Sequence, residues 1–225
     1  EVRGTVCAQA ACMNRMLTLL AVTALLLTGA ASVAPTAEAQ PYVRARRFSV
    51  EGYFIGEFLG EYRLRVNGDR RPANDIDLDP TLGGGVRVSL YWGVFAFGLM
   101  TEFRGYGNSD YSNRDFAFDM SPFIGVRIPI MANGDNVVRL RGTVPFGFTV
   151  LKPNAEAWGD DAYLGFNTGV LGGVEVSFGN FGVFTDLGFR FHRVYANNDI
   201  AIEGSVDASL SWAQLSLNAG VQLAF

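Results

Sequence analysis

A single histidine and a few groups of acidic residues are the side chains of this 225-residue sequence best suited to acid–base or metal chemistry. His192 is followed by Arg193 and Val194, so no serine stands beside it at a spacing that would make the imidazole its base. A lone imidazole is also a weak basis for a transition-metal site, because such sites combine several ligands. We therefore expect no enzyme activity and no cofactor.

The densest acidic stretch contains Asp75, Asp77 and Asp79. In an extended segment these carboxylates would share one side and could bind a divalent cation together. A solvated acidic loop, or a strand projecting above a membrane, explains the same pattern. We favour the solvated loop, because calcium loops generally need more ligands and a turn glycine.

The charged residues alternate with apolar ones, which predicts strands with one apolar and one polar face. The alternation is clearest from Leu215 to Phe225, where every second residue is apolar. It predicts eight strands, at about residues 48–59, 82–92, 94–104, 116–128, 138–150, 163–178, 181–193 and 209–225. An even number is expected of an up-and-down barrel with both termini on one side of a membrane.

The predicted connections are of two kinds. Trp92-Gly93, Asn133-Gly134-Asp135 and Gly179-Asn180 are tight turns whose residues tolerate positive φ. Residues 63–80, 105–115, 152–162 and 195–208 are longer polar loops with twelve acidic residues. Short periplasmic turns and long external loops are typical of outer-membrane barrels. Pro122 and Pro145 fall inside neighbouring strands, so we expect a β-bulge at one or both.

The composition of the two faces decides which one meets lipid. The apolar faces are crowded with Phe, Leu and Val, whereas the polar faces combine charges with glycines: Gly83, Gly85, Gly165, Gly169, Gly173 and Gly188. A soluble barrel with its apolar face inside is the alternative. A narrow eight-stranded lumen, however, must fit small residues beside long ones. We therefore predict a polar interior and a lipid-facing apolar exterior.

Charged side chains on the polar faces would point into the lumen. They are Glu51, Glu57, Arg87, Glu102, Arg104, Asp119, Arg127, Arg139, Arg141, Glu175, Asp186, Arg190 and His192. Across adjacent strands, Glu175 is expected beside Arg139 and Arg141, and Asp119 beside Glu102 and Arg104. Because unpaired buried charge is costly, a hydrogen-bonded network that plugs the lumen is favoured. The alternative is a narrow polar path that the ion pairs gate.

The N-terminal region has the features of an export signal. Residues 16–34 are mostly apolar, Arg15 precedes them, and Ala37-Glu38-Ala39 is an A-x-A cleavage site. We expect residues 1–39 to be an upstream extension, with Met13 the better start, plus a cleaved signal peptide. An uncleaved anchor is the alternative. Residues 40–47 would then be a periplasmic linker and residues 48–225 the barrel.

Charge and cysteine content exclude two kinds of chemistry. The formal net charge of −4 argues against a nucleic-acid partner, which requires concentrated basic charge. Cys7 and Cys12 both precede Met13, so the expected mature protein has no disulfide and no thiol nucleophile.

In strand number, loop asymmetry and the terminal Phe225, residues 48–225 resemble the small eight-stranded outer-membrane proteins of the OmpA transmembrane-domain and OmpX type. The resemblance implies an all-β, antiparallel up-and-down transmembrane β-barrel in the bacterial outer membrane. It also implies that Phe225 belongs to the signal read by the outer-membrane assembly machinery. The expected partners are outer-membrane lipids, lipopolysaccharide and that machinery, and the barrel is expected to be a monomer.

Three functions remain open on this basis. The favoured one is a structural or surface-interaction barrel with a plugged lumen and acidic external loops, in which Tyr106, Tyr111 and Trp158 could contact an extracellular ligand. The second is a narrow small-solute channel or porin, which conductance would reveal. The third is a lipid A-modifying enzyme, which mass spectrometry of lipid A would reveal. One deacylase family of such barrels carries a His-x-Ser pair, which the sequence around His192 lacks.

Overall fold

The computed structural model describes residues 47–66, 69–70, 76–108, 111–152, 162–196 and 208–225. Residues 1–46 lie outside the described residues, so the signal peptide and the linker stay predictions. No helix in the described ranges is long and apolar enough to cross a membrane.

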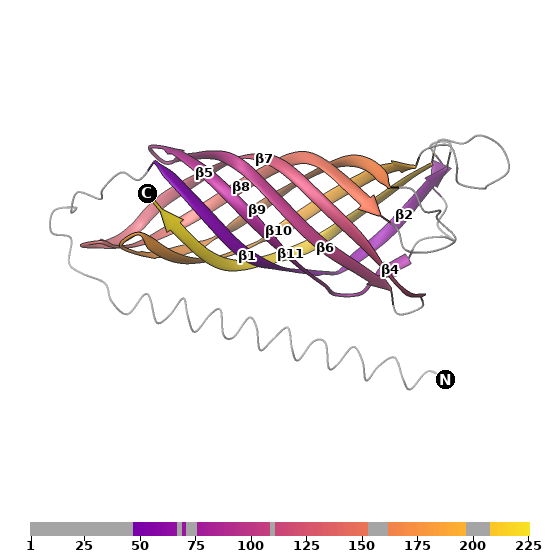
Figure 1. The fold of residues 1–225 in the computed structure, drawn as a ribbon, viewed down its shortest axis with the longest axis horizontal. Helices are drawn as coiled ribbons and strands as arrows, with labels where there is room; N and C mark the ends of the chain where they lie inside the picture. The colour runs from indigo at the N-terminus through magenta and orange to yellow at the C-terminus, as the bar shows by residue number, and fades with distance from the viewer. Residues whose placement is uncertain (1–46, 67–68, 71–75, 109–110, 153–161, 197–207) are drawn as a thin grey trace, which may run out of the picture. The chain divides into compact units, whose positions relative to one another are not determined.

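Eight antiparallel strands close into a barrel (Figure 1). They are β1 (Phe48–Phe58), β5 (Thr81–Trp92), β6 (Phe95–Asn108), β7 (Tyr111–Asn133), β8 (Asn136–Lys152), β9 (Tyr163–Phe178), β10 (Phe181–Ala196) and β11 (Ala208–Ala224). Each strand pairs with the next in this order, and β11 pairs with β1 from Ala224 opposite Ser49 to Leu215 opposite Phe58. This last ladder closes the sheet, so these strands have no free edge along the wall.

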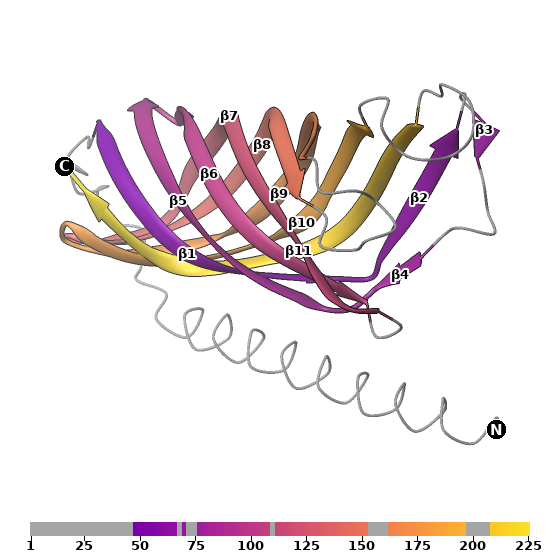
Figure 2. The same cartoon turned by 45° about the vertical axis from the view of Figure 1, so that its right-hand side comes forward.

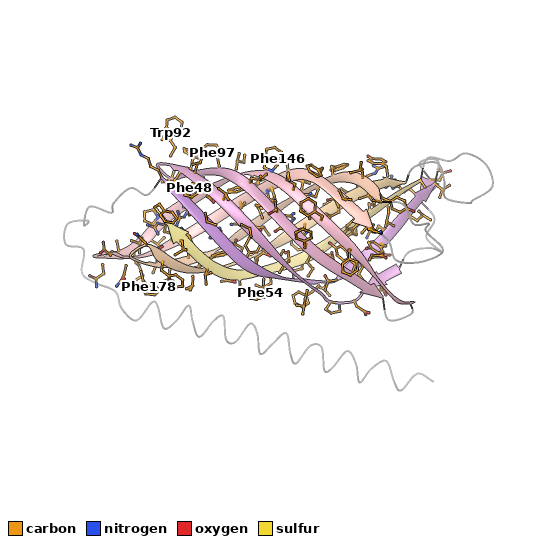
Figure 3. All side chains as sticks on the ribbon, in the orientation of Figure 1. Phe48, Phe54, Trp92, Phe97, Phe146 and Phe178 are labelled. Carbon is orange, nitrogen blue, oxygen red and sulfur yellow. The ribbon has the colours of Figure 1, made fainter. Side chains whose placement is uncertain are left out.

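The predicted apolar and polar faces are confirmed on every strand of the barrel. In contrast to a soluble protein, the apolar side chains are exposed and the polar ones are buried. Phe54 is 79% exposed, whereas its neighbours Tyr53 and Ile55 are 5% and 1% exposed. Phe54, Phe97 and Phe146 point away from the barrel (Figure 3). Apolar side chains crowd an exposed surface in this way when that surface faces lipid.

The two ends of the barrel differ, as predicted. At one end, the turn end, two-residue turns begin with Gly93, Gly134 and Gly179 at φ of 61°, 59° and 57°. A positive φ at the first turn position is the glycine-dependent hairpin geometry that fits the strand twist. The backbone N–H of Phe225 also donates to the Phe48 carbonyl at this end, at 2.8 Å. The opposite end, where the other connections lie, is the loop end.

The first predicted loop, residues 63–80, is wrong in part, because it contains strand. β2 (Gly60–Val66) continues the line of β1 and pairs with β11, while β3 (Asp69–Arg70) and β4 (Ile76–Leu78) pair with β2 (Figure 2). Phe58 lies opposite Leu215, but Arg63 lies opposite Ser211, so the β1–β2 side carries one extra residue. Leu59, at φ 59°, lies in this bulge.

The bulge at Leu59 has a consequence for side-chain direction. Odd-numbered residues of β1 such as Glu57 face inward, whereas even-numbered residues of β2 such as Tyr62 do so. One added residue reverses the faces because the side-chain period of a strand is two.

The second predicted loop, residues 105–115, is also largely strand. β6 continues to Asn108 and β7 begins at Tyr111, with Gly107 opposite Arg114. The polar residues that suggested a loop are compatible with a strand once the ladder continues beyond the apolar belt.

The bulge expected at Pro122 or Pro145 is not there. Met120 faces Phe148 and Phe123 faces Pro145, so the register of β7 and β8 is unchanged across both prolines. Proline removes one backbone donor but does not require an inserted residue. The register shift between these strands lies instead between Pro129 and Met131.

Candidate functional site

The thirteen ionisable side chains predicted for the lumen all lie on the inner face of the barrel. Eleven of them are buried. The side chains of Arg127 and Arg139 remain 11% and 13% exposed. Six arginines match six carboxylates, with His192 as the thirteenth group, so the interior is close to electrically neutral.

Four of these residues form a ring of ion pairs across the lumen. Arg141 Nη2 is 2.8 Å from Glu51 Oε2, and Arg87 Nη1 is 3.3 Å from the same oxygen. Asp186 contacts Arg87 Nη2 at 3.2 Å and Arg141 Nε at 3.1 Å. Glu51 and Arg141 come from β1 and β8, which lie on opposite sides of the closed ring of strands. The ion pairs therefore bridge the barrel.

Glu175 completes this turn-end cluster. Its Oε1 accepts hydrogen bonds from Arg127, from Arg139 Nη1 at 2.9 Å and from Ser177 at 2.6 Å. Arg141 Nη1 lies 3.9 Å from Oε2. The predicted proximity of Glu175 to Arg139 and Arg141 is thus present. We call the group of Glu51, Arg87, Arg127, Arg139, Arg141, Glu175 and Asp186 the turn-end cluster.

Arg104 is the centre of a second cluster, nearer the loop end. Its Nε lies 2.9 Å from Glu57 Oε1, its Nη2 lies 2.5 Å from Glu102 Oε2, and its Nη1 contacts Asp119. Asp119 thus meets Arg104 directly, as predicted, and is linked to Glu102 through it. One guanidinium satisfies three carboxylates from β1, β6 and β7.

Arg190 and His192 tie β10 into this loop-end cluster, which consists of them with Glu57, Glu102, Arg104 and Asp119. Arg190 Nη2 reaches Glu102 Oε2 at 2.8 Å, although β10 and β6 lie on opposite sides of the ring. His192 Nε2 lies 3.0 Å from Asp119 Oδ2, and the ring is fully buried. The sole histidine is therefore a member of a packed network.

Between the two clusters lies an apolar layer that sequence reasoning missed. It consists of Tyr53, Ile55, Ala96, Met100, Phe123, Leu171 and Phe184. The Arg87 guanidinium lies over the rings of Tyr53, Phe123 and Phe184, at 5.3, 5.6 and 5.7 Å from their centroids. These residues alternate along their strands with outward apolar residues and so have the same inward direction as the lumen charges, which was the available signal.

Inner glycines make room for the rings of this layer. A Cβ at Gly98 would lie 2.7 Å from Phe123 Cε1 and 1.9 Å from the Val88 carbonyl. A Cβ at Gly85 would lie 2.7 Å from Tyr53 Cζ. The glycines of the polar faces therefore serve the close packing of a narrow lumen.

A group of aromatic residues covers the loop end of the interior. Trp212 is 1% exposed and packs edge to face with Tyr62 at 5.2 Å and with Tyr106 at 5.5 Å. Trp212 also stacks on His192, with 4.7 Å between the ring centroids. We call Tyr62, Tyr106, Tyr163 and Trp212 the aromatic lid. The expectation that Tyr106 is exposed in a loop is wrong, because extension of β6 buries it.

The turn-end cluster, the apolar layer, the loop-end cluster and the aromatic lid follow one another along the line of β1 and β2. Its inward residues run from Glu51 through Tyr53 and Ile55 to Glu57 and then Tyr62. β1 and β2 together thus contribute a residue to each of the four groups. The interior is a series of stacked layers.

The candidate metal ligands lie elsewhere. Asp77 is exposed on β4 and Asp79 is half-buried, whereas Asp75, like Trp158 in another loop, lies outside the described residues. Among the residues that the structure describes, no three His, Cys, Asp or Glu side chains are grouped so that they could hold a metal ion. A site that includes Asp75 stays a prediction.

Comparisons with known proteins identify the fold. No protein-family model and no curated protein matches the chain. Among solved structures, the outer membrane protein OprG from Pseudomonas aeruginosa matches with a TM-score of 0.52 at 9% identity, covering 81% of this chain and 97% of OprG.

Two further structures match more loosely. Neisserial surface protein A covers 79% of this chain and 97% of its own, at 13% identity and a TM-score of 0.42. The outer membrane protease OmpT from Escherichia coli covers 84% and 100%, at 9% identity and a TM-score of 0.31. The fold of this chain is that of the small eight-stranded bacterial outer-membrane barrels, which implies location in the outer membrane. Short turns are typical of the periplasmic end of such barrels.

Proposed function

We propose that this protein is a non-conducting outer-membrane barrel with a structural or surface-interaction role, and that it is not an enzyme. The observation that carries the proposal is the stack of interior layers, each built from strands on several sides of the ring. Glu51–Arg141 and Glu102–Arg190 are ion pairs that join strands on opposite sides of the ring. Both join side chains that are at most 4% exposed.

Ion passage would require these layers to separate. Removing one partner of a buried ion pair costs about 3–5 kcal/mol, since the other charge is left uncompensated. The apolar layer and the aromatic lid add groups that offer few partners to a hydrated ion. Because the layers lie in series, opening any one of them leaves the others to block the path.

Single-channel recording in planar bilayers tests the proposal. We expect no conductance steps from the wild-type protein. We also expect none from the Glu102→Gln/His192→Ala variant, which disturbs the loop-end cluster and its contacts with Tyr53 and Trp212 but leaves the turn-end cluster intact. A heat-modifiable gel shift provides the control that each barrel is folded. A stable open pore in the wild type would overturn the proposal.

The gated channel is the second candidate, because the contacts that bridge the lumen are ion pairs that can exchange partners. Arg104 is shared by three carboxylates, so loss of one pair could redirect the others. This function predicts that the wild type is silent but that the Glu102→Gln/His192→Ala variant conducts. The same recording therefore separates the two candidates.

The surroundings of His192 support the non-enzymatic part of the proposal. General-base catalysis needs an imidazole within reach of the group that it deprotonates. Here Nε2 faces Asp119, the ring stacks on Trp212, and the side chain is inaccessible from lipid or solvent. A lipid A substrate approaching from the membrane would meet the apolar exterior of β10 instead.

The surface-interaction role rests on the external connections. Their acidic residues give the loop end a negative character that would favour a cationic ligand or divalent cations. β2, β3 and β4 extend the sheet beyond the end of β1 at this end. A sheet of this kind provides a firmer base for a binding surface than a free loop does.

A further inference from the structure

Three arginines face the exterior of the barrel near one another: Arg193 on β10, and Arg63 and Arg65 on β2, with β11 between these two strands. Arg193 lies opposite Ser211, and Ser211 lies opposite Arg63. In the next row toward the loop end, Tyr195 lies opposite Ser209 and Ser209 lies opposite Arg65. Because side chains alternate between the two faces of a strand, all of these residues point to the outside of the barrel.

We call Arg63, Arg65 and Arg193 the arginine patch. Its position along the membrane normal follows from the exterior residues of β10. The exterior residues Phe181, Val183, Leu187, Phe189 and Phe191 are 37–68% exposed and apolar. At about 3.3 Å per residue and a tilt of about 40°, the span from Phe181 to Phe191 covers roughly 25 Å of the membrane normal, which is the height of a lipid-facing band.

Arg193 is the next exterior residue of β10 after Phe191 and is charged. It lies about 5 Å further along the membrane normal. The headgroup region extends roughly 5–7 Å beyond the hydrocarbon on each side. The patch therefore lies at headgroup level in the leaflet at the loop end. The exterior residues of β11 change from apolar to polar at the same level, from Leu215 and Ala213 to Ser211 and Ser209, which supports this placement.

The contacts of the patch fix its geometry. Arg193 Nη2 donates to Ser209 Oγ at 3.2 Å, and its guanidinium lies 5.2 Å from the centroid of the Tyr195 ring. Arg63 Nε contacts Glu61 Oε2 at 3.1 Å, and Arg65 is exposed. Among the described residues of these strands, the three guanidinium groups accompany two exterior carboxylates, Glu61 and its ladder partner Asp77 on β4, which leaves a local excess of positive charge.

We propose that Arg63, Arg65 and Arg193 form a binding site for the phosphate of a phosphorylated lipid headgroup in the outer leaflet. Guanidinium groups bind phosphate in bidentate fashion, and the half-buried Ser211 between them can donate to a remaining oxygen, while the buried Ser209 accepts from Arg193 and orients it. Tyr195 is an aromatic residue of the kind that favours the membrane interface. The inference does not depend on whether the lumen conducts.

Native mass spectrometry of the protein in phosphatidylcholine nanodiscs tests the site. Bisphosphorylated lipid A, dephosphorylated lipid A and inorganic phosphate are added in separate arms. We expect the wild type to retain bisphosphorylated lipid A about tenfold more than the dephosphorylated form. The Arg63→Gln/Arg65→Gln/Arg193→Gln variant should lose this preference.

Lys152→Gln is the matched control. Lys152 is exposed at the loop end of β8, outside the patch, so its removal should leave the preference unchanged. If the triple variant fails the gel-shift test for folding, Arg65→Gln alone, on the exposed face of β2, should reduce retention several-fold.

Three results would overturn the proposal. Equal retention by the wild type and the folded arginine variants would exclude the patch as the site. Equal retention of both lipid A forms would show that acyl chains, not phosphate, hold the lipid. Displacement of lipid A by inorganic phosphate at equal concentration would identify a free-anion site instead.

Discussion

Arg104 shows how one residue can hold the barrel interior together. It contacts Glu57, Glu102 and Asp119, and within the described residues it is the only cation within ion-pair distance of Glu57. The Tyr106 hydroxyl donates to the same Glu57 carboxylate at 3.0 Å. The loop-end cluster and the aromatic lid are therefore joined at this carboxylate.

Substitution of Arg104 tests this role. We expect Arg104→Gln to lower the free energy of unfolding by about 3–5 kcal/mol, because Glu57 would remain buried without a cation. Arg104→Gln/Glu57→Gln should recover a large part of the loss. The measurement is reversible urea unfolding in lipid vesicles, followed by tryptophan fluorescence.

An exposed ion pair gives the control for this experiment. The side chains of Arg63 and Glu61 are 54% and 34% exposed, so Arg63→Gln should cost less than about 1 kcal/mol. Equal effects of Arg63→Gln and Arg104→Gln would contradict a stabilising role for the buried network.

At the scale of elements, glycines decide how closely neighbouring strands and the rings between them pack. Gly98 on β6 faces inward beneath Phe123, with the Val88 carbonyl of β5 directly beside it. Gly52 on β1 faces outward, and a Cβ there would have no atom within 4 Å. The same residue type thus has a packing role on one face and none on the other.

Alanine substitution separates these two cases. Gly98→Ala should destabilise the barrel by about 1–3 kcal/mol, since both the Phe123 ring and the β5 backbone must move. Gly52→Ala should be neutral or stabilise by up to about 1 kcal/mol, because it only restricts the unfolded chain. Urea midpoints of the two variants check this; similar midpoints would contradict the packing argument.

At the scale of the whole molecule, closure of the ring depends on the ladder between β1 and β11, which begins at the turn end with Ser49 opposite Ala224. Phe225 contributes its backbone to this seam, with its N–H donating to Phe48 at 2.8 Å. Its side chain is 66% exposed and lies 6.0 Å from the Phe48 ring, centroid to centroid. The seam therefore relies on main-chain bonds and not on burial of the Phe225 ring.

This separation makes the proposed assembly role of Phe225 testable. Phe225→Ala should reduce the folded fraction in the outer membrane of a Gram-negative host several-fold, yet leave refolding of the purified protein into detergent unchanged. Leu223→Ala is the matched control, since Leu223 is 51% exposed on the same face. An equal loss of folded protein with Leu223→Ala would mean that Phe225 carries no special signal.

Much of the fold was predictable because alternation is a local property. The positions of eight strands, their inner and outer faces and the glycine turns all depend on residues that are close in the chain. Face assignment also predicted which charges are internal. It did not reveal the bulge at Leu59 or the continuation of the sheet into β2, because both depend on pairing with the distant strand β11.

The sequence by itself thus determined a closed, lipid-facing barrel with a charged interior and two unlike ends, since period and composition carry that information. Only the tertiary structure decided which side chains meet. Closure brings Arg141 of β8 to Glu51 of β1 across the lumen, and register places Arg63, Arg65 and Arg193 on one exterior surface. These contacts depend on the shear and closure of the ring, which no short segment encodes.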